Sequence, residues 1–327
     1  RYTDLATHVT RIEEPTSVDY RGATVFKCGP WTQGPYLLES LRLLEGFDLG
    51  TMGHNRPAAI HVTVEAMKLA LADRDVYYAD QLFADVPLAE LLSTKYALVR
   101  RPLIDLGRAS LVQRPGDPRR GQALLTDVET RRGLGAPVHD TTTCVVADRW
   151  GNVVAATPSG WSGVQAGETG VWLGSRLQSF NTWLGHPNCI EPGKRPRITL
   201  TPTLVLREGK PLLAVSVAGG DGQDQASLQL VLNELDFGLQ PAESVAAVRF
   251  GTNHHLGSFR QTPPELGSLS IDAEAEAATI DKLKSLGHQV RPLTGPIWAP
   301  VVLRIDPATG RFDAAGDARA GRHAASF

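Results

Sequence analysis

The sequence predicts an α+β fold in which helices pack on antiparallel sheets. Two stretches place β-branched and small apolar residues around turn residues, as β-hairpins do: Thr142 to Thr157 and Arg197 to Ala218. Helical apolar spacing marks other segments, most clearly Pro57 to Asp75 and Gln223 to Phe237. The 327 residues are enough for one large core or two domains.

The N-terminal part is expected to supply a strand and a layer of helices. Arg1 to Gly22 lacks periodicity and is expected to be irregular. Ala23 to Cys28 is apolar and β-branched, which favours a strand. Helical spacing predicts helices at Tyr36 to Leu44, Pro57 to Asp75 and Pro87 to Leu98. We expect these helices to form a scaffold on one face of a sheet.

A long loop is expected to precede the first hairpin. Asp105 to Asp140 is rich in Pro, Gly and Arg, and such long segments are often functional or serve as linkers. The hairpin then pairs Thr142 to Ala147 with Val153 to Thr157 around the turn Asp148 to Asn152. Its strands are expected to be buried, and Cys144 with them.

The register of this hairpin brings two hydroxyl groups together. If the turn centres on Trp150, the numbers of paired residues add to about 300, and Thr141 lies opposite Ser159. A Thr that begins a chain has a distinctive chemistry. If the Asp140–Thr141 bond is cut, the hydroxyl becomes a nucleophile and its own α-amine becomes the base. A run of Thr residues alone is common at the start of structural strands.

The second hairpin leads into a pair of glycines. A turn centred on Gly209 joins Arg197 to Val205 with Pro211 to Ala218 and places Thr199 opposite Gly219. Gly219 and its neighbour Gly220 then precede a helix. Backbone N–H groups at such a junction can stabilise an oxyanion, although a Gly pair is also common in tight turns.

The C-terminal third is expected to carry further helices and a last hairpin. Helices are predicted at Pro241 to Val248 and Asp272 to Leu286, separated by a loop from Arg249 to Leu269. The hairpin is expected to pair Pro300 to Asp306 with Arg311 to Ala315.

Two sequence blocks resemble the γ-glutamyltransferase family. They are DTTTCVVADRWGN at 140–152 and GKRPRITLTPTLVLREGKPLLAVSVAGGDGQ at 193–223, with weaker similarity over 19–80. That family consists of N-terminal-nucleophile amide hydrolases and acyltransferases that cut themselves before a Thr. The resemblance implies a four-layer αββα sandwich made by two subunits, 1–140 and 141–327. It also implies that an N-terminal portion of the large subunit precedes this sequence.

The resemblance assigns roles to the residues of both hairpins. Thr141 would attack an amide carbonyl, Ser159 would orient its hydroxyl, and Gly219 with Gly220 would hold the oxyanion. If cleavage falls elsewhere in the run, the alternative nucleophiles are Thr142 and Thr143. The acyl-enzyme would pass its acyl group to water or to an amine.

Several substrate-binding positions depart from the family pattern. Arg176 and Ser179 stand where the family typically holds a substrate amino group with acidic or amide side chains, and Trp161 stands where it often has Asn. Because Arg binds carboxylates, we hypothesise an acyl group that bears a carboxylate and lacks an α-amine. Thr199 and Asp221 are expected to line the same site.

Two further hypotheses remain open. One is a related amidase of glutaryl, cephalosporin-acylase or oxamate type. The other is an uncut, inactive homologue that serves in binding or assembly. The stretch 182–196 is short where many family members have a lid, which favours hydrolysis over transfer.

Composition excludes several other classes. A net charge of −2 gives no reason to expect a nucleic acid or an anionic membrane as a partner, and no apolar run reaches about 18 residues. The three cysteines are widely spaced, which argues against a disulfide framework, and the histidines lack the spacing of metal ligands. We therefore expect no metal or cofactor. His254 and His255 are expected at the surface. The expected partners are a small amide substrate and the chain's own second subunit. Homo-oligomerisation and the choice between cytoplasm and periplasm stay open.

Overall fold

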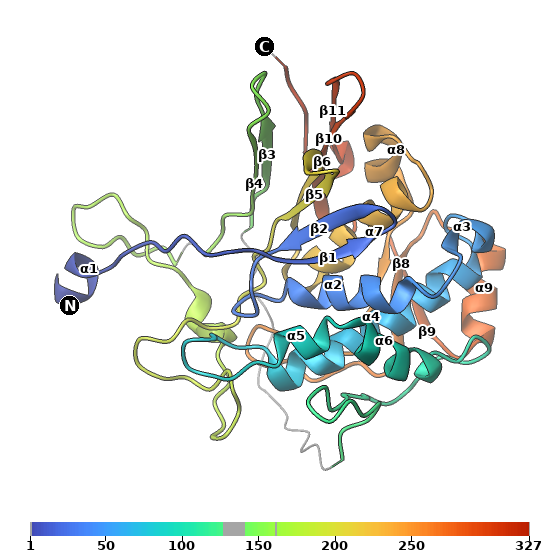
Figure 1. Cartoon of the computed structure of the whole chain (residues 1–327), viewed down its shortest axis with the longest axis horizontal. Helices are drawn as coiled ribbons and strands as arrows, with labels where there is room; N and C mark the ends of the chain where they lie inside the picture. Colours follow the sequence, from blue (N-terminus) through green and yellow to red (C-terminus); the bar gives the residue numbers. More distant parts are fainter. Residues whose placement is uncertain (1, 127–140, 161, 327) are drawn as a thin grey trace.

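A six-stranded antiparallel sheet is the centre of the molecule, which we describe from a computed structural model covering residues 2–126, 141–160 and 162–326. Its strand order is β1-β2-β5-β6-β10-β11 (Figure 1). Strands from both ends of the chain therefore meet in one sheet. The strands are β1 (Thr16–Tyr20), β2 (Ala23–Lys27), β5 (Thr203–Arg207), β6 (Lys210–Ala218), β10 (Ala299–Ile305) and β11 (Phe312–Gly316).

Helices cover one face of this sheet. Helix α2 contacts β1, β2, α4 and α7, and α7 contacts β6, so a layer from distant parts of the sequence forms beside the strands (Figure 1). The longest helix, α4, is buried along most of its length. The helices are α1 (Tyr2–Ala6), α2 (Pro35–Leu44), α3 (Leu49–Met52), α4 (Pro57–Tyr77), α5 (Leu88–Leu91), α6 (Thr94–Arg100), α7 (Gln223–Leu235), α8 (Pro241–Ala246) and α9 (Ala277–Ser285).

The other face of the sheet carries a two-stranded hairpin, β3 (Cys144–Ala147) and β4 (Val153–Ala156). Alternation along β6 separates the two faces, because successive side chains of a strand point to opposite sides. Val215 and its i±2 neighbours join the large core with the helices, whereas Ala214 joins a small core with Leu303 and the hairpin. In the described part of the chain, helices, sheet and hairpin thus form three successive layers.

A smaller sheet lies beyond the helices. It consists of β7 (Phe250–Gly251), β8 (Ser268–Asp272) and β9 (Gln289–Leu293), with β8 and β9 parallel and α9 between them in sequence. The short 3-10 helices are η1 (Arg101–Leu103), η2 (Arg176–Ser179), η3 (Gly220–Gly222) and η4 (Ala318–Ala320). Among the described helices, none is both long enough and apolar enough to span a bilayer.

The structure corrects two expectations for the N-terminal part. The first 22 residues are not irregular throughout, because they contain α1 and β1. In β1 the alternating Val18 and Tyr20 are buried against the core. The single helix expected at 87–98 is two helices, α5 and α6. The second begins where the Ser93 hydroxyl accepts a hydrogen bond from the Tyr96 amide at 3.1 Å, a typical N-cap.

Further corrections concern strands. Residues 197–202 are not part of β5, and Pro202, which has no N–H for a ladder, directly precedes that strand. The loop expected at 249–269 contains β7 and the start of β8, and α9 begins at Ala277 instead of Asp272. The first hairpin is not buried on both faces, since Cys144 is exposed and Val146 is 52% exposed.

Candidate active site

The first hairpin has the predicted register. Cys144 pairs with Ala156 and the partner numbers add to 300 along the ladder, which the Thr142 amide extends by donating to the Pro158 carbonyl at 3.0 Å. The turn is held by Asp148, whose carboxylate accepts hydrogen bonds from the Trp150 and Asn152 amides and from the Asn152 side chain. These bonds hold the pKa of Asp148 below its usual value.

This register brings the two predicted hydroxyls together. Thr141 Oγ1 donates to Ser159 Oγ over 3.0 Å. The Arg176 guanidinium, from η2, also donates to Ser159, and it lies over the ring of Phe259 at 5.3 Å from the centroid. A cation and an aromatic ring therefore lie next to the hydroxyl pair. Two predicted site residues, Asp140 and Trp161, lie outside the described residues.

The second hairpin delivers its glycines to the start of α7. The pairs away from the turn, such as Thr203 with Val215, have numbers that add to the predicted 418, whereas the two pairs next to the turn are shifted by one residue and add to 417. The backbone at Gly219 and Gly220 has φ of 150° and 57°, and both values favour glycine. If the Gln223 amide is oriented to satisfy its neighbours, its carbonyl oxygen accepts from the Gly220 N–H at 3.3 Å. The glycine turn thus lies at the beginning of a 13-residue helix.

Thr199 and Ser179 are buried. Thr199 precedes β5 and lies outside the ladder, but the Gln33 amide donates both to its carbonyl, at 3.3 Å, and to the Gly220 carbonyl, at 3.2 Å. The Thr199 segment is therefore tied to the glycine turn by Gln33, a contact that the sequence did not predict. Within the described residues, the hydroxyls of Thr199 and Ser179 have no hydrogen-bond partner.

Asp221 lies inside a buried network. Its Oδ1 forms an ion pair with Arg74 at 2.7 Å and accepts a hydrogen bond from the Ser258 hydroxyl, and its Oδ2 accepts one from the Ser258 amide at 2.8 Å. Burial alone would raise the pKa of Asp221, but Arg74, His255 and Ser258 outweigh it and hold the pKa well below the usual range. Asp221 is therefore an anion that already has partners, and sequence reasoning missed Arg74.

The sequence profile of the family described as gamma-glutamyltranspeptidase matches residues 1–327. This chain belongs to the gamma-glutamyltranspeptidase family. It is 31% identical over 296 residues to a glutathione hydrolase proenzyme of Pseudomonas sp. (strain A14), covering 90% of this chain and 49% of that protein. It is also 31% identical over 293 residues to the acylase ACY 1 proenzyme of Pseudomonas sp. (strain SE83), covering 88% and 47%.

A solved structure, LmbA2991HD, is similar over nearly the whole chain. The sequence identity is 35% and the TM-score is 0.85, with 98% of this chain and 56% of that chain covered. This gamma-glutamyltranspeptidase family chain thus has the mixed helix-and-sheet fold of its relatives. It spans about half the length of the curated relatives it matches.

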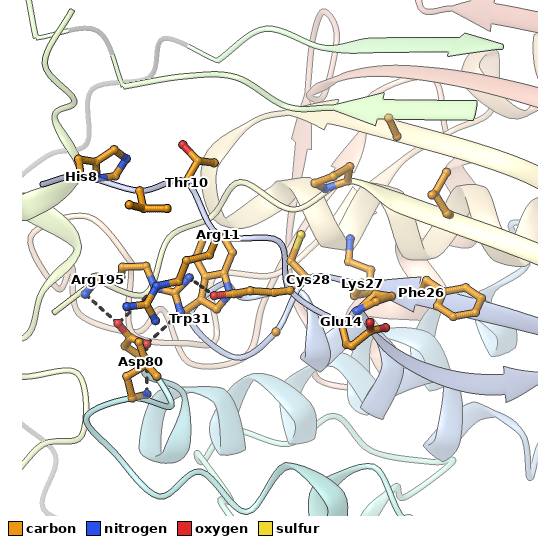
Figure 2. A pocket seen from close by; sticks show the side chains of 18 of the residues that line it. His8, Thr10, Arg11, Glu14, Phe26, Lys27, Cys28, Trp31, Asp80 and Arg195 are labelled. Atoms are coloured by element: carbon orange, nitrogen blue, oxygen red, sulfur yellow. Dashed lines mark hydrogen bonds and ion pairs between the residues drawn. The ribbon is translucent and has the colours of Figure 1, made fainter. Parts of the chain in front are cut away.

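Two cavities lie near the elements that carry the site. One, of about 320 Å³, is lined by Gly219, Asp221, Phe259 and Trp298 and so touches both the glycine turn and the ring beneath Arg176. A larger one, of about 1000 Å³, lies between the N-terminal arm 7–15 and strands β2 and β5 (Figure 2). Among the described residues, none of the predicted site residues lines the larger cavity, whereas Gly219 and Asp221 line the smaller one, so we centre the candidate site there.

One buried cluster has metal-ligating side chains. His61, Glu65 and His288 bring potential ligand atoms within 4.8 Å of one another. However, Glu65 already pairs with Lys68 at 2.7 Å and with Arg114 at 3.0 Å. Two cations therefore face the only carboxylate of the cluster, and a divalent cation would meet repulsion there.

The paired histidines expected at the surface are in fact buried. His254 and His255 are 0% and 4% exposed, and their loop folds back over the end of α4. The His254 Nδ1 accepts from the Gly267 amide at 2.9 Å, and His255 Nδ1 lies 3.1 Å from Arg74. Gly and Asn in the sequence suggested an exposed loop. However, both histidines contact residues elsewhere in the sequence, and a local sequence pattern does not indicate such contacts.

Proposed function

We propose that this chain carries the catalytic centre of a self-cleaving amide hydrolase or acyltransferase of γ-glutamyltransferase type. The observation that carries the proposal is the 3.0 Å contact between the hydroxyls of Thr141 and Ser159, at the end of a hairpin with the predicted register. Membership of the gamma-glutamyltranspeptidase family and similarity to proteins named proenzymes support it.

The proposed reaction begins when cleavage of the Asp140–Thr141 bond frees the Thr141 amine. That amine takes the proton of the Thr141 hydroxyl as the oxygen bonds to the substrate carbonyl carbon. Gly219 and Gly220 amides stabilise the oxyanion, and Ser159 orients the nucleophile. The C–N bond then breaks, the proton passes to the leaving amine, and water or another amine releases the acyl group.

In this proposal residues 1–140 belong to the large subunit and 141–327 form the small catalytic subunit. Both contribute to a single four-layer αββα sandwich. Strands from both parts pair in the main sheet, where β2 lies next to β5, and this supports one folding unit. After cleavage, each part would be the other's obligate partner.

The acyl group would carry a carboxylate bound near Arg176. Support comes from the position of the Arg176 guanidinium beside Ser159. Arg176 replaces the acidic or amide group that would hold an α-amine, and one relative is named an acylase. A related amidase with glutaryl-type specificity is therefore the second candidate. Hydrolysis rates of matched γ-glutamyl and glutaryl anilides separate the two, because clear preference for the γ-glutamyl compound contradicts this assignment.

The proposed function is tested with variants of the full-length protein. Thr141→Ala should lose self-cleavage and amide hydrolysis, whereas Thr142→Ala, at the next residue, should keep both. The N-terminal sequence of the smaller fragment should begin at Thr141. An intact chain in an active preparation, or a Thr141→Ala variant with wild-type activity, contradicts the proposal. An intact and inactive wild-type chain favours the uncut binding homologue instead.

A further inference from the structure

The glycine turn, residues 219–222, has few side chains that could restrict its backbone conformation. Three of the four residues from Gly219 to Gly222 are glycine, and glycine allows more backbone conformations than any other residue. Asp221 is held on one side by Arg74 and Ser258. An oxyanion-binding turn must hold its amides fixed before the reaction, since the benefit depends on preorganised donors. The glycines of the turn therefore need a packing contact besides the bonds to Asp221.

Trp298 also lies against the turn. Strand β10 pairs Ala299 with Ala218 of β6, and the next step of this ladder places Trp298 opposite Gly219. The indole then extends across the turn to β7. A Cβ added to Gly219 or Gly222 would overlap the indole, and one added to Gly251 would overlap its far edge. The ring therefore lies directly against the backbone of these glycines.

Two of these glycines have no backbone reason to be glycine. Gly222 has φ −77° and ψ −11°, which any residue adopts, and Gly251 has no positive φ. The indole accounts for both, because a side chain at either position would occupy its space. Trp298 itself has φ 62°, which is rare for a bulky residue and persists only when the surroundings enforce it.

Contacts of the neighbouring residues hold the backbone of Trp298 in this conformation. The Arg249 Nε donates to the carbonyl of Ile297 at 2.7 Å, and β10 begins directly after Trp298. Trp298 also lines the cavity of about 320 Å³ with Gly219, Asp221 and Phe259. The strained backbone thus lies at the wall of the candidate active site.

We infer that Trp298 is a positioning residue for the oxyanion-binding turn. Its indole packs on Gly219 and Gly222 and fixes the direction of the Gly219 and Gly220 amides, while Asp221 connects the turn to Arg74. This inference rests on the proposed function, because it assigns Trp298 a role in aiming donors that the proposed reaction uses. Removing the ring would leave a slot beside three flexible glycines and let the amides turn away.

The test compares Trp298→Ala and Trp298→Phe in the full-length protein, with Trp150→Ala as a control at a 75% exposed tryptophan. Rates with a chromogenic anilide are normalised to folded, self-cleaved enzyme. Trp298→Ala should lower kcat by about 10- to 100-fold, below the loss for deleting a donor outright, with KM changed less than about threefold. Trp298→Phe should recover part of kcat, and Trp150→Ala should match wild type.

A second measurement follows the turn without chemistry. Amide hydrogen exchange of the peptide that contains Gly219 and Gly220 should accelerate in Trp298→Ala and stay unchanged in Trp150→Ala. Adding Gly222→Ala should be harmful in wild type and cost little more in the Trp298→Ala background, because the clash is gone.

The outcomes distinguish the two hypotheses. Unchanged kcat in folded Trp298→Ala, with Thr141→Ala inactive, overturns the role of Trp298 and leaves the proposed function intact. An active Thr141→Ala variant overturns the proposed function itself. Faster exchange with unchanged kcat shows that Trp298 only stabilises the turn, and this result also contradicts the inference.

Discussion

A single carboxylate, Asp221, links the candidate site to the helical layer. Arg74 lies in the last turn of α4, fully buried, and its guanidinium reaches Asp221, Asp75 and the Leu256 carbonyl. Burying such a charge is costly unless every donor has a partner. The network therefore fixes the residue next to the glycine turn with contacts from more than 140 positions away in the sequence.

Replacing Asp221 should change how the free energy of unfolding depends on pH. Because its folded pKa is lowered, its stabilising effect is fully present above the unfolded pKa of about 3.9 and is lost as the pH falls below it. Asp221→Asn should destabilise the protein by on the order of 3 kcal/mol at pH 7, and the difference should shrink below about pH 4. Urea unfolding at pH 7, 5 and 3.5 measures it.

A matched control is Asp313→Asn, which breaks an exposed ion pair with Arg311 and should change stability by less than about 1 kcal/mol. A difference between wild type and Asp221→Asn that stays constant down to pH 3 contradicts the assigned pKa direction.

At the scale of single residues, the sequence predicted the contacts that depend only on the register of one hairpin. Thr141 and Ser159 belong to one short hairpin, so counting from the turn was enough to pair them. Arg74 and Trp298 were not predicted, because nothing in their own neighbourhoods indicates the distant glycines and carboxylate that they contact. The one signal available was the run of glycines, which indicates that some side chain fills the space beside them.

At the scale of the elements, a chain of hydrogen bonds, here called the tie, joins the two hairpins that carry the site. The Ser216 hydroxyl of β6 donates to the Ala156 carbonyl of β4 at 2.8 Å, so the Thr157 hydroxyl must donate to Ser216 at 2.7 Å. Thr157 precedes Ser159 by two residues, and Ser216 precedes Gly219 by three. We therefore expect this pair to help fix the spacing between the hydroxyl pair and the glycine turn.

Breaking the tie should affect both stability and rate. Ser216→Ala leaves the buried Thr157 hydroxyl without its acceptor and should cost about 1–3 kcal/mol. It should also lower kcat, because the two hairpins lose their fixed spacing. Thr157→Val combined with Ser216→Ala should cost less than the sum of the single changes, since no buried hydroxyl remains unpaired. Chemical unfolding and anilide hydrolysis provide the measurements.

The control for this experiment is Thr24→Val, which removes an exposed hydroxyl contact with Asp19 elsewhere in the same sheet. Equal kcat values for wild type and Ser216→Ala would contradict a role of the tie in spacing the site.

Elements were predictable where their pattern is strong and local. Helices α2, α4 and α7 begin within a residue of their expected starts, because Pro, Gly and apolar spacing mark them. Strands β7, β8 and β9 were missed, since each is short and β8 pairs in parallel with β9, which lies on the other side of α9 in the sequence. Propensity does not encode such parallel pairing, which depends on the packing of the whole molecule.

For the whole molecule, buried neutral histidines should control stability in mild acid. Burial lowers the pKa of His254 and of His288 to about 3 and that of His186 to about 4. In the unfolded chain these groups have a pKa of about 6.5. Below that value the unfolded state binds protons that the folded state does not, so stability is full above pH 6.5 and falls as the pH decreases.

Each such histidine should contribute up to about 1.4 kcal/mol of lost stability per pH unit between pH 6 and 4.5. His288→Gln should therefore reduce the slope of unfolding free energy against pH by about that amount, whatever it does to stability at pH 7. His8→Gln, at an exposed position, is the control and should leave the slope unchanged. The slope is read from urea unfolding at several pH values in this range, above the titration of most carboxylates. If His288→Gln and wild type have the same slope, the acid sensitivity does not arise from His288.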